Sequence, residues 1–135
     1  MKNKLIGLAV LAVIGAITIK FWNDPITAAQ PTVTVEIKVP QFSTAALDGQ
    51  QTFNSNCAVC HGENAAGTDQ GPSFLQKTYG TTHHADFAIT LAVKNGVRAH
   101  HWRFGSMSPV PGITDDEIAG IVAYIREMQQ ANGLE

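Results

Sequence analysis

Cysteine is nearly absent from this chain, which has only two in 135 residues. With so few, the chain has no disulfide framework of the kind that cross-links small secreted domains. Basic residues are also scarce after the N-terminal segment: from Asn23 onward, six Lys and Arg stand against eleven Asp and Glu, a net charge of −5. This balance argues against a nucleic-acid partner and suggests docking to a neutral or basic patch on another protein. No nucleophile is paired with a general base, so the sequence does not predict an enzyme.

The first 22 residues contain the longest apolar run of the chain. Two lysines precede the run, Leu5–Ile19, and the aromatic residues Phe21 and Trp22 follow it. Such a run is either the core of a signal peptide or a short membrane span. The nearest small-residue cleavage site, 27–29, lies well beyond the run, and the two aromatic residues resemble an interfacial anchor. We therefore favour an uncleaved signal-anchor at 1–22 over a cleaved signal peptide, with the rest of the chain across the membrane.

Residues 23–42 are rich in Pro, Thr and Gln and are predicted to form a linker. Within it, apolar and polar side chains alternate over residues 33–39, a period-2 pattern that is typical of a strand. An extended linker explains the same residues, and both interpretations stay open. A strand would need a pairing partner, either in this domain or on another subunit.

Residues 43–135 predict a small all-α domain with three main helices. Ser43 or Thr44 can cap the first helix, which runs toward residue 57. The second covers residues 84–95, and Gly96 follows as its C-cap. One side of this second helix carries Phe87, Ala88, Leu91 and Ala92.

The third helix has the clearest signals. Residues 114–117, Thr-Asp-Asp-Glu, match a capping box, and apolar residues then recur at helical spacing until Gly133 closes the helix. Three modest helices in about 90 residues make a thin core. We therefore expect the domain to need a bound group that completes its interior.

Residues 57–61 read Cys-Ala-Val-Cys-His and contain both cysteines. This is the C-x-x-C-H pattern of covalent c-type haem attachment. The thiols of Cys57 and Cys60 can form thioethers with two vinyl groups of one porphyrin, and His61 can then bind the iron axially. A protein with this motif is expected to move electrons. Because haem is joined to such proteins outside the bacterial cytoplasm, the motif agrees with a domain in the periplasm.

Other interpretations of the two cysteines fit less well. A thioredoxin-like redox pair needs an alternating β/α pattern, which the sequence lacks. A structural disulfide across so short a loop, with a histidine attached, would be unusual. A zinc site stays open as an alternative, because two further ligands could come from the histidines at 83, 84, 100 and 101.

An electron-carrying haem needs a second axial ligand besides His61, and Met107 is the natural candidate. It lies in the short loop 105–109 with nothing else apolar beside it, so a packing role alone explains it less well. A thioether ligand stabilises ferrous iron and raises the reduction potential relative to two histidines. His100 or His101 could be the ligand instead of Met107.

From about residue 47 to residue 133, the chain resembles the small class I cytochromes c. The resemblance rests on the motif at 57–61, on Gly-Pro-Ser-Phe-Leu at 71–75, and on Met107 ahead of a capped final helix. It implies a fold of three main helices around one covalently bound haem c. It also implies a single-electron carrier of a respiratory chain, working between redox partner proteins.

The same resemblance assigns roles to individual residues. The carbonyl of Pro72 is expected to accept a hydrogen bond from His61 Nδ1–H, which orients the imidazole. Gly49 and Phe53 on the first helix are expected to cross Tyr124 on the last. The weaker candidates for the haem edge or its propionates are Tyr79, Trp102 and Arg103.

Two histidine pairs lie outside the family pattern: His83 and His84, and His100 and His101. The second pair, with Trp102, could pack against the haem edge while a ring nitrogen or Arg103 binds a propionate. Either pair could form part of a docking surface. Both pairs could also converge on a transition metal such as copper, for which imidazole is a good ligand.

The sequence thus predicts a signal-anchor (1–22), a linker (23–42) and a cytochrome c domain (43–135), held at the bacterial inner membrane and facing the periplasm. One alternative is a cytochrome subunit fixed to a larger dehydrogenase or oxidase. Another is a haem sensor that binds ligands, which would require an open or labile sixth position on the iron.

Overall fold

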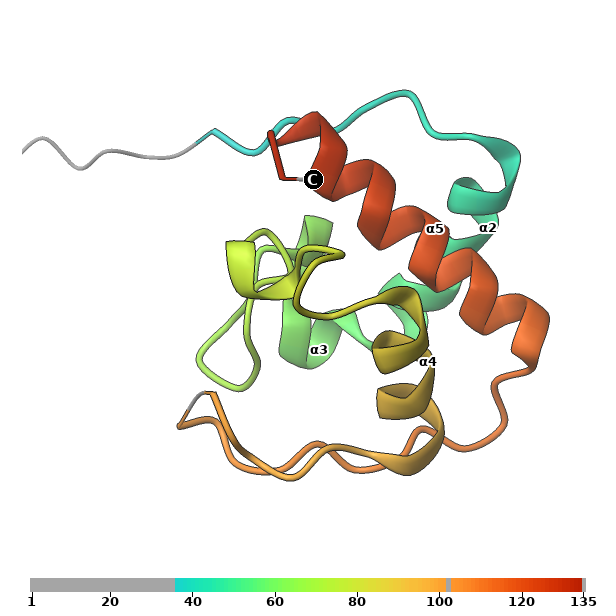
Figure 1. The fold of residues 1–135 in the computed structure, drawn as a ribbon. Coiled ribbons are helices and arrows are strands. Elements are labelled where there is room, and N and C mark those ends of the chain that lie inside the picture. The colour runs from blue at the N-terminus through green and yellow to red at the C-terminus, as the bar shows by residue number, and fades with distance from the viewer. Residues whose placement is uncertain (1–35, 102, 135) are drawn as a thin grey trace, which may run out of the picture. The chain divides into compact units, whose positions relative to one another are not determined.

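The structure, a computed structural model, describes residues 36–101 and 103–134, and its regular elements are helices (Figure 1). The α-helices are α2 (Thr44–Asn56), α3 (Ala58–His61), α4 (Asp86–Asn95) and α5 (Asp115–Ala131), and two 3₁₀ helices, η1 (Glu63–Ala65) and η2 (Lys77–Tyr79), lie between α3 and α4. The described residues contain no strand, only an isolated antiparallel bridge between Val97 and Met107. The prediction of an all-α domain is therefore confirmed for this part of the chain.

The predicted signal-anchor at 1–22 and the first part of the predicted linker, 23–35, lie outside the described residues. Among the helices that are described, none combines the length and the apolar character that crossing a bilayer requires.

Residues 36–42, which the sequence assigns to the linker, belong to the compact unit that begins at Glu36. The N–H of Lys38 donates to Asn132 Oδ1 (3.0 Å), and the carbonyl of Lys38 accepts from Asn132 Nδ2 (2.8 Å). Ile37 and Phe42 pack against the hydrophobic core. The described part of the possible strand, residues 36–39, is therefore not a strand, because a side-chain amide serves its backbone in place of a neighbouring strand.

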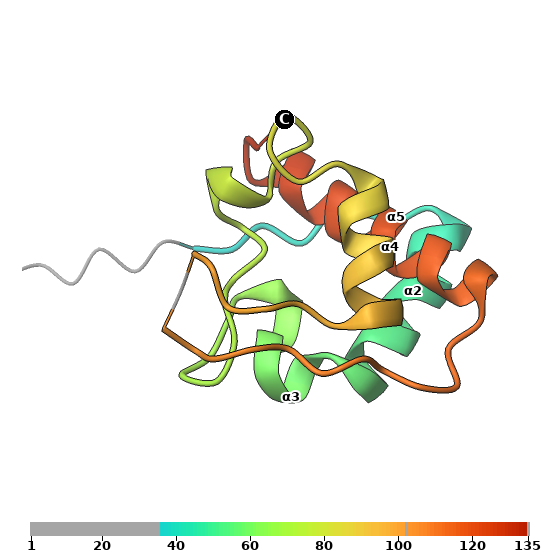
Figure 2. The same cartoon turned by 60° about the horizontal axis from the view of Figure 1, so that its bottom comes forward.

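The helices α2 and α5 lie across each other in both views (Figures 1 and 2), and two glycines lie at the crossing. A Cβ added to Gly49 would lie 1.8 Å from the carbonyl oxygen of Gly120, so only glycine lets the two backbones approach this closely. Beside them the rings of Phe53 and Tyr124 are fully buried, with centroids 5.1 Å apart. The expected contact of Gly49 and Phe53 with the last helix is confirmed, and Gly120 is the partner that sequence reasoning missed.

Side chains cap both of these helices where the sequence predicts caps. Ser43 Oγ accepts the N–H of Ala46 (3.2 Å) and donates to Glu127 Oε1 (2.6 Å), which ties the start of α2 to the end of α5. At the start of α5, Thr114 Oγ1 accepts the N–H of Glu117 (3.3 Å), and the Glu117 carboxylate accepts the N–H of Thr114 (2.8 Å). Both halves of the predicted capping box are present.

The buried residues of α4 differ from those that the sequence places on one side of the helix. Ile89 and Val93 are buried, whereas Phe87 is 69% exposed. The other three residues of that side line a cavity: Ala88, Leu91 and Ala92. Ile89 and Val93 line the same cavity, so the part of α4 that faces it extends beyond the residues that the sequence places on one side of the helix.

Candidate functional site

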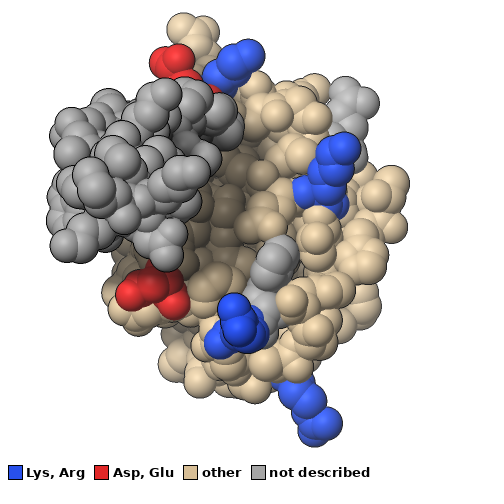
Figure 3. All heavy atoms as spheres, turned by 90° about the vertical axis from the view of Figure 1, so that its left-hand side faces the viewer, with Lys and Arg blue, Asp and Glu red and all other residues tan. Residues whose placement is uncertain are grey.

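A cavity of about 360 Å³ lies between the end of α2, helix α4 and the loop that follows α4. Its walls are mainly apolar, with Phe53, Ile121 and Ile125 contributed by the core. Figure 3 shows that the described surface is hollowed on one face, where uncharged side chains dominate and side chains of both charges lie farther out. A large, flat and mostly apolar ligand suits such a cavity.

The cysteines lie on one helical turn, because α3 begins directly after Cys57 and ends with Cys60 and His61. Cys57 is 9% exposed and lines the cavity, while Cys60 is half-buried against Gly71. Burial, with a smaller contribution from Cys60, raises the pKa of the Cys57 thiol to about 11. A free thiol there is protonated at neutral pH, unlike the thiolate of a reactive redox pair.

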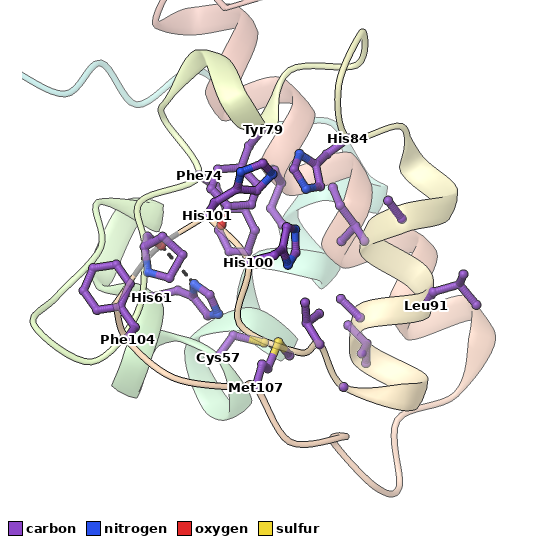
Figure 4. Close-up of a pocket in the computed structure, with 18 of the residues that line it drawn as sticks. Cys57, His61, Phe74, Tyr79, His84, Leu91, His100, His101, Phe104 and Met107 are labelled. Carbon is purple, nitrogen blue, oxygen red and sulfur yellow. Dashed lines mark hydrogen bonds between the residues drawn. The ribbon is translucent and has the colours of Figure 1, made fainter.

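His61 lines the cavity wall with one ring nitrogen available. Its Nδ1 lies 3.0 Å from the carbonyl oxygen of Pro72 (dashed in Figure 4). Since a carbonyl can only accept, the proton is on Nδ1 and Nε2 keeps its lone pair. Burial lowers the pKa of His61, which the bond to Pro72 partly offsets, so the ring is neutral at pH 7. A neutral imidazole oriented through Nδ1 is the form that binds a metal.

Met107 is half-buried, lines the cavity (Figure 4), and has a firmly held backbone. Its N–H and carbonyl are both bonded to Val97, each at 2.9 Å, and the N–H of Val110 donates to the carbonyl of Val93 at 2.9 Å. At Gly96 the chain turns with φ +72°, and a Cβ there would lie 2.4 Å from the Met107 oxygen. The loop therefore holds Met107 against the end of α4.

The other predicted haem-edge residues have different positions. Tyr79 lines the cavity. Arg103 is exposed and is not among the lining residues, and Trp102 lies outside the described residues. Arg98 and Phe104 do line the cavity, and sequence reasoning missed both because an irregular loop has no periodicity from which side-chain direction can be inferred.

The two histidine pairs, far apart in the sequence, lie together at one end of the cavity. His84, His100 and His101 line it (Figure 4). Among the described residues, the side chains close enough to share a metal ion are three histidines, at 83, 84 and 101, and neither cysteine is among them. The zinc site built from Cys57 and Cys60 therefore finds no support here.

Two residues of α5, Arg126 and Gln129, hold the loop that carries the first histidine pair. Arg126 donates to the carbonyl of Tyr79 (2.7 Å) and to the carbonyl of His84 (2.5 Å). Gln129 Nε2 donates to the carbonyl of Tyr79 as well (3.0 Å). Sequence reasoning missed both residues. Gln129 could have been found, because a polar side chain on the apolar face of a helix needs buried hydrogen-bond partners.

The residues present therefore fit a covalently held haem. Cys57 lines an apolar cavity, Cys60 lies one helical turn away, and His61 offers a free Nε2. Met107 lines the same cavity and offers a thioether sulfur. Figure 4 shows Cys57, His61 and Met107 around one part of the cavity.

Comparison with known proteins agrees with this geometry. A family model described as Cytochrome c matches residues 46–129, a range that contains most of α2, all of α3 and α4, most of α5 and the motif at 57–61. The chain is also similar to cytochrome c6 from Tetradesmus obliquus, with 36% identity over 94 residues. This alignment covers 63% of the chain and 90% of the relative.

Proposed function

Since the chain belongs to the cytochrome c family, we propose that it shuttles single electrons with a haem iron held between His61 and Met107. Family membership makes it an electron-transfer protein with a covalently bound haem c. The haem, when bound, supplies a one-electron couple between ferric and ferrous iron.

The protein's own residues would attach, orient and bury this group. Cys57 and Cys60 would form the two thioether links. The bond from His61 Nδ1–H to Pro72 holds the proton away from the iron-binding nitrogen, fixes the ring and makes Nε2 a stronger donor. The apolar walls would exclude water and thereby influence the reduction potential.

The position of Met107 is the observation that favours a closed iron site, and with it an electron carrier over a sensor. Its sulfur-bearing side chain lines the same cavity as His61, and its backbone is held on both sides by bonds to the end of α4. A ligand on so firmly held a loop need not move much when the iron changes oxidation state. Little reorganisation on electron transfer is what a carrier requires, whereas a sensor requires a labile sixth position.

We expect Met107→Leu to open the iron to external ligands, because leucine has no donor atom. Visible spectra of the haem-loaded protein test this. The wild type should show the long-wavelength ferric band of methionine ligation and its ferrous form should ignore carbon monoxide, whereas Met107→Leu should lose the band and bind carbon monoxide. Met128→Leu is the matched control, because Met128 is fully buried in the core and does not line the cavity.

Two results would overturn the assignment. Ready binding of carbon monoxide by the wild type would mean an open or labile site and would favour the sensor. A variant at position 107 that stays low-spin and closed would mean that a histidine is the ligand, with His100 and His101 the next residues to replace.

We also propose that residues 1–22 hold the domain at the bacterial inner membrane, facing the periplasm. The apolar run Leu5–Ile19 after two lysines supports this, as does the compartment in which haem is attached to this motif.

We expect the full chain to fractionate with membranes. A chain that lacks residues 1–22 and is exported by a cleavable signal peptide should be released. Recovery of the native protein as a shorter periplasmic chain would mean that the segment is cleaved, and stable co-purification with a large dehydrogenase or oxidase would favour a fixed subunit over a shuttle.

A further inference from the structure

The histidines at 83, 84 and 101 form a cluster that the haem assignment leaves without a role. The nitrogen atoms that these side chains can offer to a metal all lie within 4.8 Å of one another. Nε2 of His83 and Nε2 of His101 lie 3.2 Å apart, within hydrogen-bond distance of each other. Two nitrogens each about 2.0–2.1 Å from a tetrahedral zinc ion lie about 3.3 Å apart, so this pair already has the spacing of two ligands on one ion.

His84 is pre-oriented in the way that metal-binding histidines usually are. Its Nδ1 lies 2.5 Å from the carbonyl oxygen of Thr78, which can only accept, so the proton is on Nδ1 and Nε2 keeps its lone pair. The carbonyl of His84 is bound in turn by Arg126, whose side chain is only 16% exposed. A fixed backbone together with a bonded Nδ1–H leaves the ring little freedom, as in known metal sites.

The other two rings can adjust to His84. His83 and His101 are exposed, so small side-chain rotations can bring their nitrogens to a common ion. The nearby Arg98 and Arg103 are exposed, where solvent and salt screen their charge.

We propose that His83, His84 and His101 bind one divalent transition metal ion, zinc or copper in chemical class, at the histidine-lined end of the haem cavity. Three imidazole ligands without a carboxylate select these ions over magnesium and calcium, which prefer oxygen ligands. The site is independent of Met107 and His61, so it stands or falls separately from the function proposed above. His100 lies outside the site, because it is not one of the three histidines whose nitrogens are close enough to share an ion.

Zn²⁺ binding to the full haem-loaded chain tests the proposal, because Zn²⁺ is redox-silent. Isothermal titration should give one saturable site with a dissociation constant on the order of micromolar or below, and Mg²⁺ should give none. Zinc-edge X-ray absorption should count three imidazole ligands. His83→Gln and His101→Gln should each weaken binding by at least about tenfold, the lower end of the loss caused by removing even an outer-shell partner.

His100→Gln is the matched control and should bind Zn²⁺ like the wild type. The haem spectrum and the unfolding midpoint of each variant check that the fold and the iron site are intact. Saturable binding that survives unchanged in both His83→Gln and His101→Gln would place the ion elsewhere and overturn the proposal. Absence of a saturable site in the wild type would also overturn it, and would favour histidines that only pack against the haem edge.

Discussion

Gly49→Ala should strongly destabilise the fold, lowering the free energy of unfolding by about 3 kcal/mol or more. The added Cβ would lie 1.8 Å from the carbonyl oxygen and 2.1 Å from the carbonyl carbon of Gly120. Both are backbone atoms inside a helix, so no side-chain rotation relieves the clash and α2 must move away from α5. The separation would break the contact of Phe53 with Tyr124, and the gain in helix propensity, about 1 kcal/mol, is too small to compensate.

Urea unfolding of the haem-loaded protein, followed by far-UV circular dichroism, measures this effect. Gly120→Ala is the matched comparison, because its Cβ would meet Ala45 and Gly49 atoms no closer than 3.2 Å. We expect that variant to stay within about 1 kcal/mol of the wild type, since a small adjustment and a better helix former offset each other. Equal losses from the two substitutions would show that the close approach at Gly49 is not what limits the crossing.

Replacing Cys57 and Cys60 together by alanine should leave a chain that does not fold cooperatively. Without the thioether links the haem can dissociate, and a cavity of about 360 Å³ opens beside the core. At roughly 24 cal/mol per Å³ of cavity, its upper-limit cost is about 9 kcal/mol, because water can enter an open pocket and reduce the loss. The free energy of unfolding of a small domain is only about 5–15 kcal/mol, so the cost of the cavity is comparable with the whole of that free energy.

Circular dichroism during thermal unfolding, with haem content measured in parallel, tests this expectation. Val59→Ala is the matched control within the motif, because Val59 is 75% exposed and should leave both haem content and midpoint unchanged. Each single cysteine variant should keep one thioether and unfold at an intermediate temperature. A double variant that unfolds as sharply and at the same temperature as the wild type would mean that the polypeptide folds without covalently attached haem.

The features that could be predicted from the sequence are local ones. The helix starts at Ser43 and Thr114 depend on side chains within three residues of the cap, so short sequence patterns contain the needed information. The same is true of the motif at 57–61, whose spacing places Cys57 and His61 on one turn. Where the contacts are local, pattern and structure agree.

The features that could not be predicted depend on contacts with parts of the chain that are remote in the sequence. Nothing in the sequence of α4 says that Ile89 and Val93 are buried while Phe87 is exposed, because the helix is apolar on more than one side. The meeting of the two histidine pairs depends on two irregular loops, whose directions follow from remote bonds such as those of Arg126. From the sequence alone, Gly120 is only a poor helix former, and its role becomes clear once Gly49 is known to lie against it.

Helix α5 also sets the distance between two contacts, its crossing with α2 and its bonds to the loop that carries His84. Gly120 fixes its crossing with the helix that leads into the cysteines, and Arg126, six positions later, holds the histidine-bearing loop. One residue inserted between them would turn Arg126 by about 100° and shift it by about 1.5 Å relative to Gly120. Substitutions in this stretch can be absorbed by neighbouring side chains, but a change of length cannot. In the evolution of such a chain, insertions and deletions would therefore be excluded from this stretch of α5.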